Sequence, residues 1–181
     1  MSMHDIPKKP TPEIMEWIDS SWGMNDDGVL IWIRDGLSKG IQAGDPIYCG
    51  LMSNGYMICR TSTKPRRALK AHHLVWYFTH GEWPSLQVDH IDNNRANNEP
   101  SNLRLATKTQ NMQNRKPTKS RDLPKGVIRS YKDNYAAIIR CNNERRYLGY
   151  FKTVEDAAQA YEQASLSLHK EFSYYAPQEV S

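Results

Sequence analysis

At 181 residues, the chain is long enough for one domain or for two small ones. It contains no run of 18 apolar residues, and its first residues lack the apolar region of a signal peptide, so we expect a soluble protein without a membrane span. The formal net charge of +4 is uneven, because residues 61–121 alone hold 11 basic and 4 acidic residues. Such a basic middle segment favours a polyanionic partner.

The three cysteines, Cys49, Cys59 and Cys141, show neither CxxC spacing nor a pattern of pairs. They predict no zinc site, because structural zinc sites use closely spaced cysteine and histidine pairs. Unpaired cysteines are also typical of a reducing compartment, so the sequence predicts a cytoplasmic setting.

The first third of the chain predicts one short helix and a few short strands. Residues 1–12, which include three prolines, predict a flexible leader. A helix is predicted over residues 13–22 and a buried strand over residues 28–33. Residues 35–46 are rich in glycine and predict a loop.

A hairpin and a helix are predicted next. Asn54-Gly55 lies between two apolar runs, which is a strong signal for a β-hairpin. The basic run over residues 64–70 is either a solvated face or a DNA contact. A helix is predicted over residues 71–80, where Gly81 ends it. Within that helix, His72 and His73 are interpreted as packing or surface residues and not as ligands.

The segment over residues 88–114 carries the candidate chemistry. An apolar strand holds Asp89 and His90, and an Asn-rich loop leads through Asn102 into a second short strand. A helix is predicted to begin after Thr107, so Asn111 lies one turn into it. A carboxylate and an amide oxygen suit a hard cation such as Mg²⁺, and a neutral histidine can take a proton from water. The alternative is an Asn-rich surface loop with a stray histidine.

This strand, loop, strand and helix layout resembles the HNH endonucleases of the ββα-metal type, in particular the homing endonucleases of phages and mobile elements. In that branch an Asp-His pair is followed by asparagines 12 and 21 residues after the histidine, as Asn102 and Asn111 follow His90. The resemblance implies that Asp89 and Asn111 bind Mg²⁺ or Mn²⁺ and that His90 is the general base. It implies that Asn102 ties the loop and so fixes His90. Gly55-Tyr56 and the segment AHHLVW also resemble this branch.

The last third predicts a different unit. Three strand-like runs over residues 126–131, 135–141 and 145–150 precede a helix that Thr153 caps and that extends to about residue 170. Acidic residues mark the outer face of the helix, whereas the sheet segment over residues 122–151 holds 6 basic and 3 acidic residues. This separation of charge predicts that the sheet, and not the helix, faces DNA.

The pattern YLGYF followed by AA and AY resembles the apetala/ethylene-response-factor DNA-binding domain, in which a three-stranded sheet lies in the major groove. The resemblance implies DNA contacts at Lys125, Arg140, Arg145 and Tyr147. Two arginines of the family's first strand are replaced here by Ile128 and Ser130, for which we expect Arg129 and Lys132 to compensate. A plain packing module of sheet and helix is the alternative.

Together these patterns predict an α+β chain: a small N-terminal sheet with a ββα-metal HNH nuclease unit, then a three-stranded antiparallel sheet packed on one helix. The expected division is a leader (1–12), the nuclease domain (13–115), a basic linker (116–124), the DNA-binding domain (125–175) and a tail (176–181). The expected activity is metal-dependent nicking of double-stranded DNA in the cytoplasm of a bacterial or phage-infected cell, with Arg104 and Lys108 offsetting charge on the phosphate.

One nuclease site cuts one strand, so a monomer is expected to nick, and double-strand cleavage requires a dimer or two successive events. Two other functions remain open at this point. One is a DNA-binding regulator with a catalytically silent HNH scaffold. The other is action on RNA or structured single strands.

Overall fold

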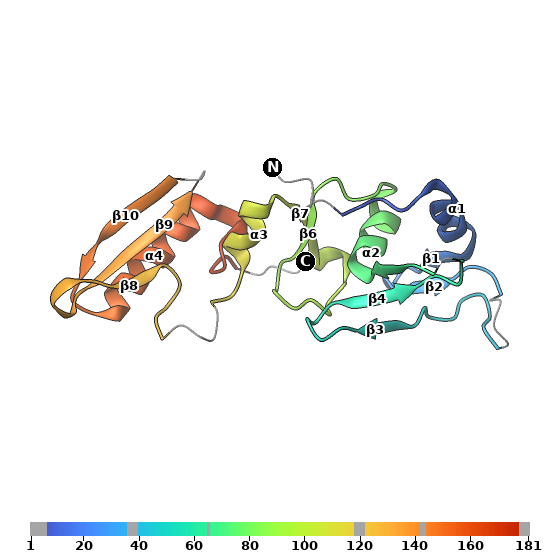
Figure 1. The fold of residues 1–181 in the computed structure, drawn as a ribbon, viewed down its shortest axis with the longest axis horizontal. Helices are drawn as coiled ribbons and strands as arrows, with labels where there is room; N and C mark the ends of the chain where they lie inside the picture. Colours follow the sequence, from blue (N-terminus) through green and yellow to red (C-terminus); the bar gives the residue numbers. More distant parts are fainter. Residues whose placement is uncertain (1–6, 36–39, 65, 118–121, 142–143, 178–181) are drawn as a thin grey trace. The chain divides into compact units, whose positions relative to one another are not determined.

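The computed structural model describes residues 7–35, 40–64, 66–117, 122–141 and 144–177 (Figure 1). Predictions for residues 1–6, 36–39, 65, 118–121, 142–143 and 178–181 lie outside the described residues, including half of the leader and much of the linker and tail. The chain divides into two compact units between Lys108 and Thr109. In the described part, the chain is a mixed α and β protein with small antiparallel sheets and four α-helices.

The first unit begins with the predicted helix and a two-stranded sheet. Helix α1 (Pro12–Ser21) starts with proline at its first position, where the missing N–H is not needed. Strand β1 (Trp22–Met24) then pairs antiparallel with β2 (Leu30–Trp32), which confirms the buried strand. The rings of Trp17, Trp22 and Trp32 meet edge to face with centroids 4.9–6.2 Å apart and form part of the core.

A three-stranded antiparallel sheet follows, in the order β3 (Cys49–Leu51), β4 (Met57–Arg60) and β5 (Ala68–Lys70). The hairpin predicted around Asn54-Gly55 is confirmed, and Gly55 has the positive φ of +86° that such a turn requires. Strand β5 was not predicted, because the basic run that contains it has no alternation of apolar and polar residues.

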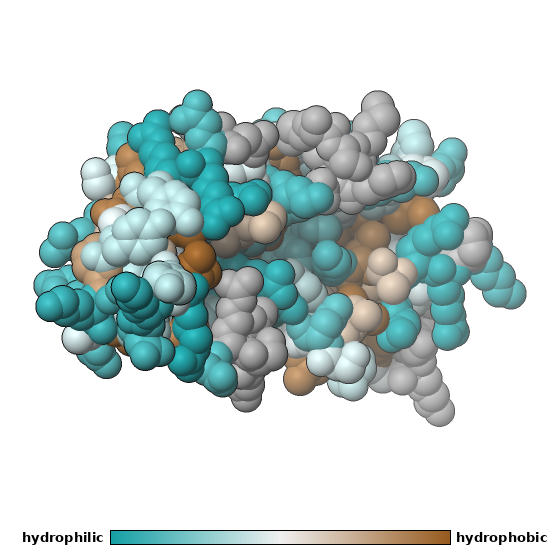
Figure 2. All heavy atoms as spheres, turned by 60° about the vertical axis from the view of Figure 1, so that its left-hand side comes forward, coloured by the Kyte–Doolittle hydropathy of each residue, from teal (hydrophilic) through white to brown (hydrophobic). Residues whose placement is uncertain are grey.

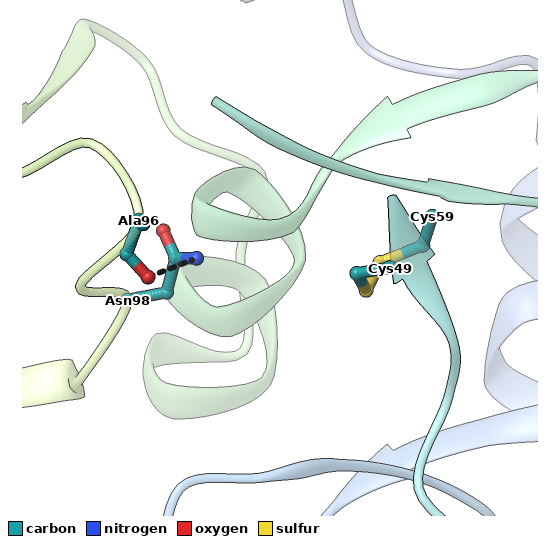
Figure 3. Close-up of a disulfide and its surroundings, with 4 residues drawn as sticks. All are labelled: Cys49, Cys59, Ala96 and Asn98. Atoms are coloured by element: carbon teal, nitrogen blue, oxygen red, sulfur yellow. Dashed lines mark hydrogen bonds between the residues drawn. A yellow bond between two sulfur atoms is a disulfide. The ribbon is translucent and has the colours of Figure 1, made fainter. Parts of the chain in front are cut away.

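Cys49 and Cys59 form a disulfide across the β3–β4 pair, with their Cα atoms 4.4 Å apart (Figure 3). The prediction that the cysteines are unpaired is therefore wrong. The signal was present in the sequence, because the two cysteines are equally spaced about the turn residue Asn54 and so face each other in the hairpin register. Since disulfides persist in oxidising compartments, this pair removes the basis on which the reducing setting was predicted. Cys141 is free and buried.

The predicted helix and the predicted strands of the candidate segment are present in the first unit. Helix α2 spans Ala71–His80 as predicted, and Gly81 ends it in the left-handed conformation with φ of +73°. Strands β6 (Gln87–His90) and β7 (Leu103–Ala106) pair antiparallel, and a 3₁₀ turn, η2 (Pro100–Asn102), precedes β7. Figure 1 places α2 beside β4, and α2 also contacts β1, β5 and β6.

Helix α3 (Lys108–Asn114) follows Thr107 as predicted, and the second unit starts within it at Thr109. Strands β8 (Val127–Arg129), β9 (Tyr135–Cys141) and β10 (Glu144–Phe151) then form an antiparallel sheet in that order. Helix α4 (Val154–His169) packs against one face of this sheet (Figure 1). At its start, the backbone N–H of Asp156 donates to Thr153 Oγ1 at 3.1 Å, which confirms the predicted cap.

Small side chains let α4 lie close to the sheet. Ala137 on β9 and Ala157 on α4 are fully buried, beside Val127, Ile139 and Tyr161.

At the far end of α4 lies a buried polar network that the sequence did not predict. Ser165 Oγ bonds to both Ser173 Oγ (2.8 Å) and His169 Nδ1 (3.1 Å), and His169 Nε2 bonds to the main-chain oxygen of Arg140 at 2.9 Å. This network joins the helix end to β9. Two further 3₁₀ turns are η3 (Tyr131–Asp133) and η4 (Lys170–Phe172).

Candidate functional site

Asp89 and His90 are the last two residues of β6, and both are buried, with 6% and 4% of their surface exposed. Successive side chains of a strand point to opposite faces, so the carboxylate and the imidazole leave the strand in different directions. Buried charged groups require partners, because an unpaired charge in a protein interior is strongly unfavourable. The surroundings of each side chain therefore indicate what it can do.

The carboxylate of Asp89 is paired with Arg104. The two residues face each other across the β6–β7 ladder, and Arg104 donates to Asp89 Oδ2 from Nε at 3.1 Å and from Nη2 at 3.0 Å. Both side chains are largely buried, which strengthens the ion pair. The sequence predicted Arg104 as a contact to DNA. In the structure, its guanidinium contacts the carboxylate that is predicted to hold a metal.

The imidazole of His90 is oriented by Asn98, a residue that the sequence analysis did not single out. His90 Nε2 lies 3.1 Å from Asn98 Oδ1, while Asn98 Nδ2 donates to the main-chain oxygen of Ala96 at 3.3 Å (Figure 3). The bond to Ala96 fixes which end of the amide faces the histidine. Because an amide oxygen only accepts, His90 Nε2 must carry the proton, and Nδ1 is the basic nitrogen of the neutral ring.

The rings of His72 and Tyr56 lie close to the imidazole of His90. His72 on α2 packs edge to face against it with centroids 5.0 Å apart, and the ring of Tyr56 lies 6.0 Å away. Burial lowers the pKa of His90, an effect that the bond to Asn98 and the charge of Asp89 partly oppose. The environment thus favours a neutral imidazole at neutral pH. The sequence analysis excluded His72 from the site, whereas the structure places it directly behind His90.

The loop between β6 and β7 is held by Asn102, which is fully buried. Its amide accepts from the backbone N–H of Asp92 at 3.1 Å, and it donates to Asp92 Oδ1 at 3.0 Å and to the main-chain oxygen of Asn97 at 2.9 Å. A second link runs from the backbone N–H of Ile91 to the main-chain oxygen of Asn102 at 3.0 Å. These bonds close the loop that begins at His90.

Asp92 completes this network. Burial alone would raise the pKa of its carboxyl, but hydrogen bonds from Asn94, Asn97 and Asn102 outweigh that effect, and the pKa is lowered. The carboxylate therefore stays ionised and keeps accepting the bonds that shape the loop.

A carboxylate such as that of Asp89 suits a hard divalent cation, and the partner described for it in the structure is the guanidinium of Arg104. Carboxylate and amide oxygens are the ligands that Mg²⁺ prefers, and a carboxylate can accept from an arginine and bind a cation together, because its oxygens carry about four lone-pair sites. Among the described residues, no three His, Cys, Asp or Glu side chains cluster as a metal site. The predicted ligands differ from such a cluster, because they are one carboxylate, Asp89, and one asparagine, Asn111. Asn111 lies in α3, within the second unit, so its place in the site stays a prediction.

In the second unit, several of the predicted DNA-binding residues share the sheet face that points away from α4. Arg140 and Arg145 are directly opposite each other in the β9–β10 register, and Tyr147 lies further along β10 on the same face. Tyr150, which was not predicted, joins them there, with its ring 5.9 Å from that of Tyr147. Both tyrosines are exposed, by 55% and 68%. Figure 2 shows hydrophilic side chains over much of the surface that it presents.

The other predicted DNA contacts lie elsewhere. Lys125 Nζ donates to the main-chain oxygens of Gln113 and of Arg115 (2.8 Å), so its ammonium stabilises the end of α3. By strand alternation, Arg129 shares the face of Val127, which packs on α4. Lys132 lies in the η3 turn, with Nζ 5.5 Å from the centroid of the Tyr131 ring. Lys108 is the exposed first residue of α3.

Parts of the chain are similar to known proteins. Residues 69–113, which span β5 to α3, match the family model described as HNH endonuclease. This segment of the chain is therefore similar to the HNH endonuclease family. A relative named as an uncharacterized HNH endonuclease of Acanthamoeba polyphaga mimivirus is 39% identical over 101 residues, which are 55% of this chain and 51% of the relative.

A solved structure on DNA binding and cleavage by the HNH homing endonuclease I-HmuI is also similar, with a TM-score of 0.41 and 23% identity over 52% of this chain and 51% of that one. The chain thus spans about half the length of each relative that it matches. None of the helices in the described ranges has the length and apolar character that a membrane span needs.

Proposed function

We propose that this chain is a metal-dependent DNA endonuclease of the homing type, with its HNH nuclease in the first part and a target-binding module in the second. The observation that carries the proposal is the arrangement of His90, oriented by Asn98 and adjacent to the buried carboxylate of Asp89, within a segment of the HNH family. The proposal includes the ββα-metal arrangement, the domain boundaries given by the sequence, and cutting by a monomer that nicks one strand.

His90 is the general base of the proposed reaction. Its Nδ1 accepts a proton from the attacking water, while Asn98 keeps the proton on Nε2 and holds the ring in place. A neutral histidine is required for this task, and burial favours that form. Asn102 acts through the loop, because its bonds to Asp92 and Asn97 fix the chain that carries Asn98.

Asp89 and Asn111 are the proposed ligands of a divalent cation, Mg²⁺ or Mn²⁺. Such an ion would polarise a phosphoryl oxygen and stabilise the leaving alkoxide. Arg104 orients the Asp89 carboxylate through its two bonds to Oδ2. The positive charge of Arg104 also lowers the energy of an anionic phosphate nearby.

The outer face of the β8–β10 sheet is the proposed DNA-binding surface. Like charges placed directly opposite each other across a strand pair are unfavourable, and Arg140 and Arg145 are such a pair. A phosphate or a guanine edge between the two guanidinium groups relieves their repulsion. Tyr147, with the Arg145 guanidinium 5.6 Å from its ring centroid, supplies a flat contact surface beside them. The acidic residues Glu155 and Asp156 lie on α4, on the opposite side of the sheet.

Supercoiled plasmid incubated with the full chain tests the proposed function. We expect open-circular product with Mg²⁺ or Mn²⁺ and no product with EDTA, because the chemistry requires the cation. Single-stranded RNA, added as a competing substrate, tests the alternative that the protein acts on RNA. Plasmid that stays supercoiled at every metal concentration, with DNA still shifted on a gel, would establish the DNA-binding regulator in place of the nuclease.

Removing residues 122–181 is expected to weaken duplex binding by about 10-fold or more, because the positive outer face of the sheet is lost with its phosphate contacts. Metal-dependent cutting persists at high protein concentration, since the proposed nuclease residues lie before residue 122. Cleavage of a random-sequence library, with the product ends sequenced, measures site preference. A truncated protein that kept the preference of the full chain would show that the sheet does not recognise the target.

A further inference from the structure

Two cationic side chains converge on one aromatic ring beside the proposed nuclease site. The ring belongs to Tyr56, which follows the β3–β4 turn. Lys70 Nζ and the guanidinium carbon of Arg95 each lie 4.7 Å from its centroid. These residues come from three separate segments: the hairpin, the end of β5 and the loop after β6. We call Tyr56, Lys70 and Arg95 the Tyr56 cluster.

Contacts with the surrounding backbone fix the positions of Arg95 and Lys70 in the Tyr56 cluster. Arg95 Nη1 donates to the main-chain oxygen of Asn54 at 2.8 Å, which holds the guanidinium near the hairpin turn. Lys70 is the last residue of β5 and is opposite Ile58 in the sheet register, so its backbone is fixed as well. The tyrosine ring attracts both cations through its electron-rich face. The fold therefore holds two positive charges near each other, although like charges repel.

Among the described residues, neither Lys70 nor Arg95 forms an ion pair with an acidic side chain. Arg104, by contrast, is paired with Asp89. Partial desolvation of the ammonium and the charge of Arg95 both lower the pKa of Lys70, as expected for two cations that lie near each other. An anion bound beside both cations would reduce that repulsion.

The Tyr56 cluster lies next to the proposed general base. The Tyr56 ring is 5.1 Å from that of His72 and 6.0 Å from that of His90. Burial and the positive charge of Arg95 lower the pKa of His90, and burial and the positive charge of Lys70 lower that of His72. Both cations are exposed, so a ligand from solvent can reach them. An anion held here would therefore lie close to the group that attacks the substrate.

We propose that Lys70 and Arg95, held on the ring of Tyr56, bind a backbone phosphate of DNA next to the one that is cleaved. This inference rests on the proposed function. Arginine presents a planar fork of N–H donors that fits phosphate oxygens, and lysine adds a compact charge on the other side. The cluster contacts the backbone only, so it places the strand without reading sequence.

The salt dependence of DNA binding tests the cluster, and it is measured in the His90→Ala background so that no cleavage is needed. Neutralising one phosphate contributes about 0.9 to the slope of log affinity against log salt concentration. The double variant Lys70→Ala, Arg95→Ala is expected to reduce the slope by about 1 and the affinity several-fold on a short duplex of arbitrary sequence. Each single variant should lose nearly as much as the double, because both side chains bind the same phosphate.

Two further variants serve as controls. Arg34→Ala removes an exposed arginine that follows β2 and is not part of the cluster, and it should leave the slope unchanged. Tyr56→Leu keeps both cations but removes the ring that positions them, and it should lower the affinity. Unfolding curves of all variants confirm that the fold is retained. An unchanged slope in a folded double variant overturns the phosphate site, whatever the plasmid assay gives, whereas an uncut plasmid with a reduced slope overturns only the nuclease.

Discussion

Replacing His90 with alanine is expected to reduce the rate of DNA cleavage by about 10²–10⁴-fold, the range lost when a positioned general base is removed. Binding of duplex DNA should remain, because His90 is buried and does not belong to the proposed DNA surface. The measurement is the rate of plasmid nicking under single-turnover conditions, together with a gel-shift titration of the same preparations.

Comparison variants separate catalysis from stability. Asn98→Leu leaves the imidazole in place but removes the oxygen that accepts from Nε2, so it should reduce cleavage less than His90→Ala does. His80→Ala, at the exposed end of α2, should change nothing. If His90→Ala nicked plasmid at the wild-type rate, the base would be another group, and the chemistry proposed for β6 would be wrong.

The sequence predicted those parts of the fold that local signals specify. Helix α2 has apolar residues at helical spacing and ends at a glycine that adopts positive φ, so both of its ends were predicted correctly. The Asn-Gly turn and the cap at Thr153 are likewise properties of a few adjacent residues. Such signals do not depend on how distant segments pack.

The neighbours of His90 depend on that packing. The loop after β6 contains several asparagines, and their equal chemistry gives no indication that Asn98 faces the imidazole while Asn102 closes the loop. The Tyr56 cluster joins three segments whose proximity follows from the packing of two sheets against α2. Hairpin register, by contrast, is a property of the sequence around a short turn, and the turn at Asn54-Gly55 places Cys49 opposite Cys59. The long loop between β6 and β7 leaves the register that pairs Asp89 with Arg104 unspecified.

The two adjacent histidines of α2 should make the first unit sensitive to acid. Burial lowers the pKa of His72 far below its usual range and lowers that of His73 to about 3, and the charges of Lys70 and His90 add to both effects. In the unfolded chain each keeps a pKa near 6.5. Below that pH the unfolded state binds more protons than the folded state, so the free energy of unfolding falls as pH falls.

The expected loss is about 1.4 kcal/mol per pH unit for each histidine, or about 4–5 kcal/mol for the pair between about pH 6.5 and pH 4.5. That is a large part of the stability of a small domain, which is typically about 5–15 kcal/mol. All five tryptophans precede residue 109, so the fluorescence of the full chain during urea unfolding reports this unit selectively. The free energy of unfolding is read at a series of pH values.

His72→Phe isolates the contribution of one group. Phenylalanine replaces the buried ring, which is 2% exposed, without a titrating nitrogen, so the slope of unfolding free energy against pH should fall by about 1.4 kcal/mol per unit. The variant also removes a buried nitrogen, Nδ1, which has no hydrogen-bond partner in the described part of the fold, so stability at neutral pH need not suffer. If His72→Phe left the pH profile unchanged, the His72 ring would be hydrated in solution. Water would then reach the side of His90 that the His72 ring contacts.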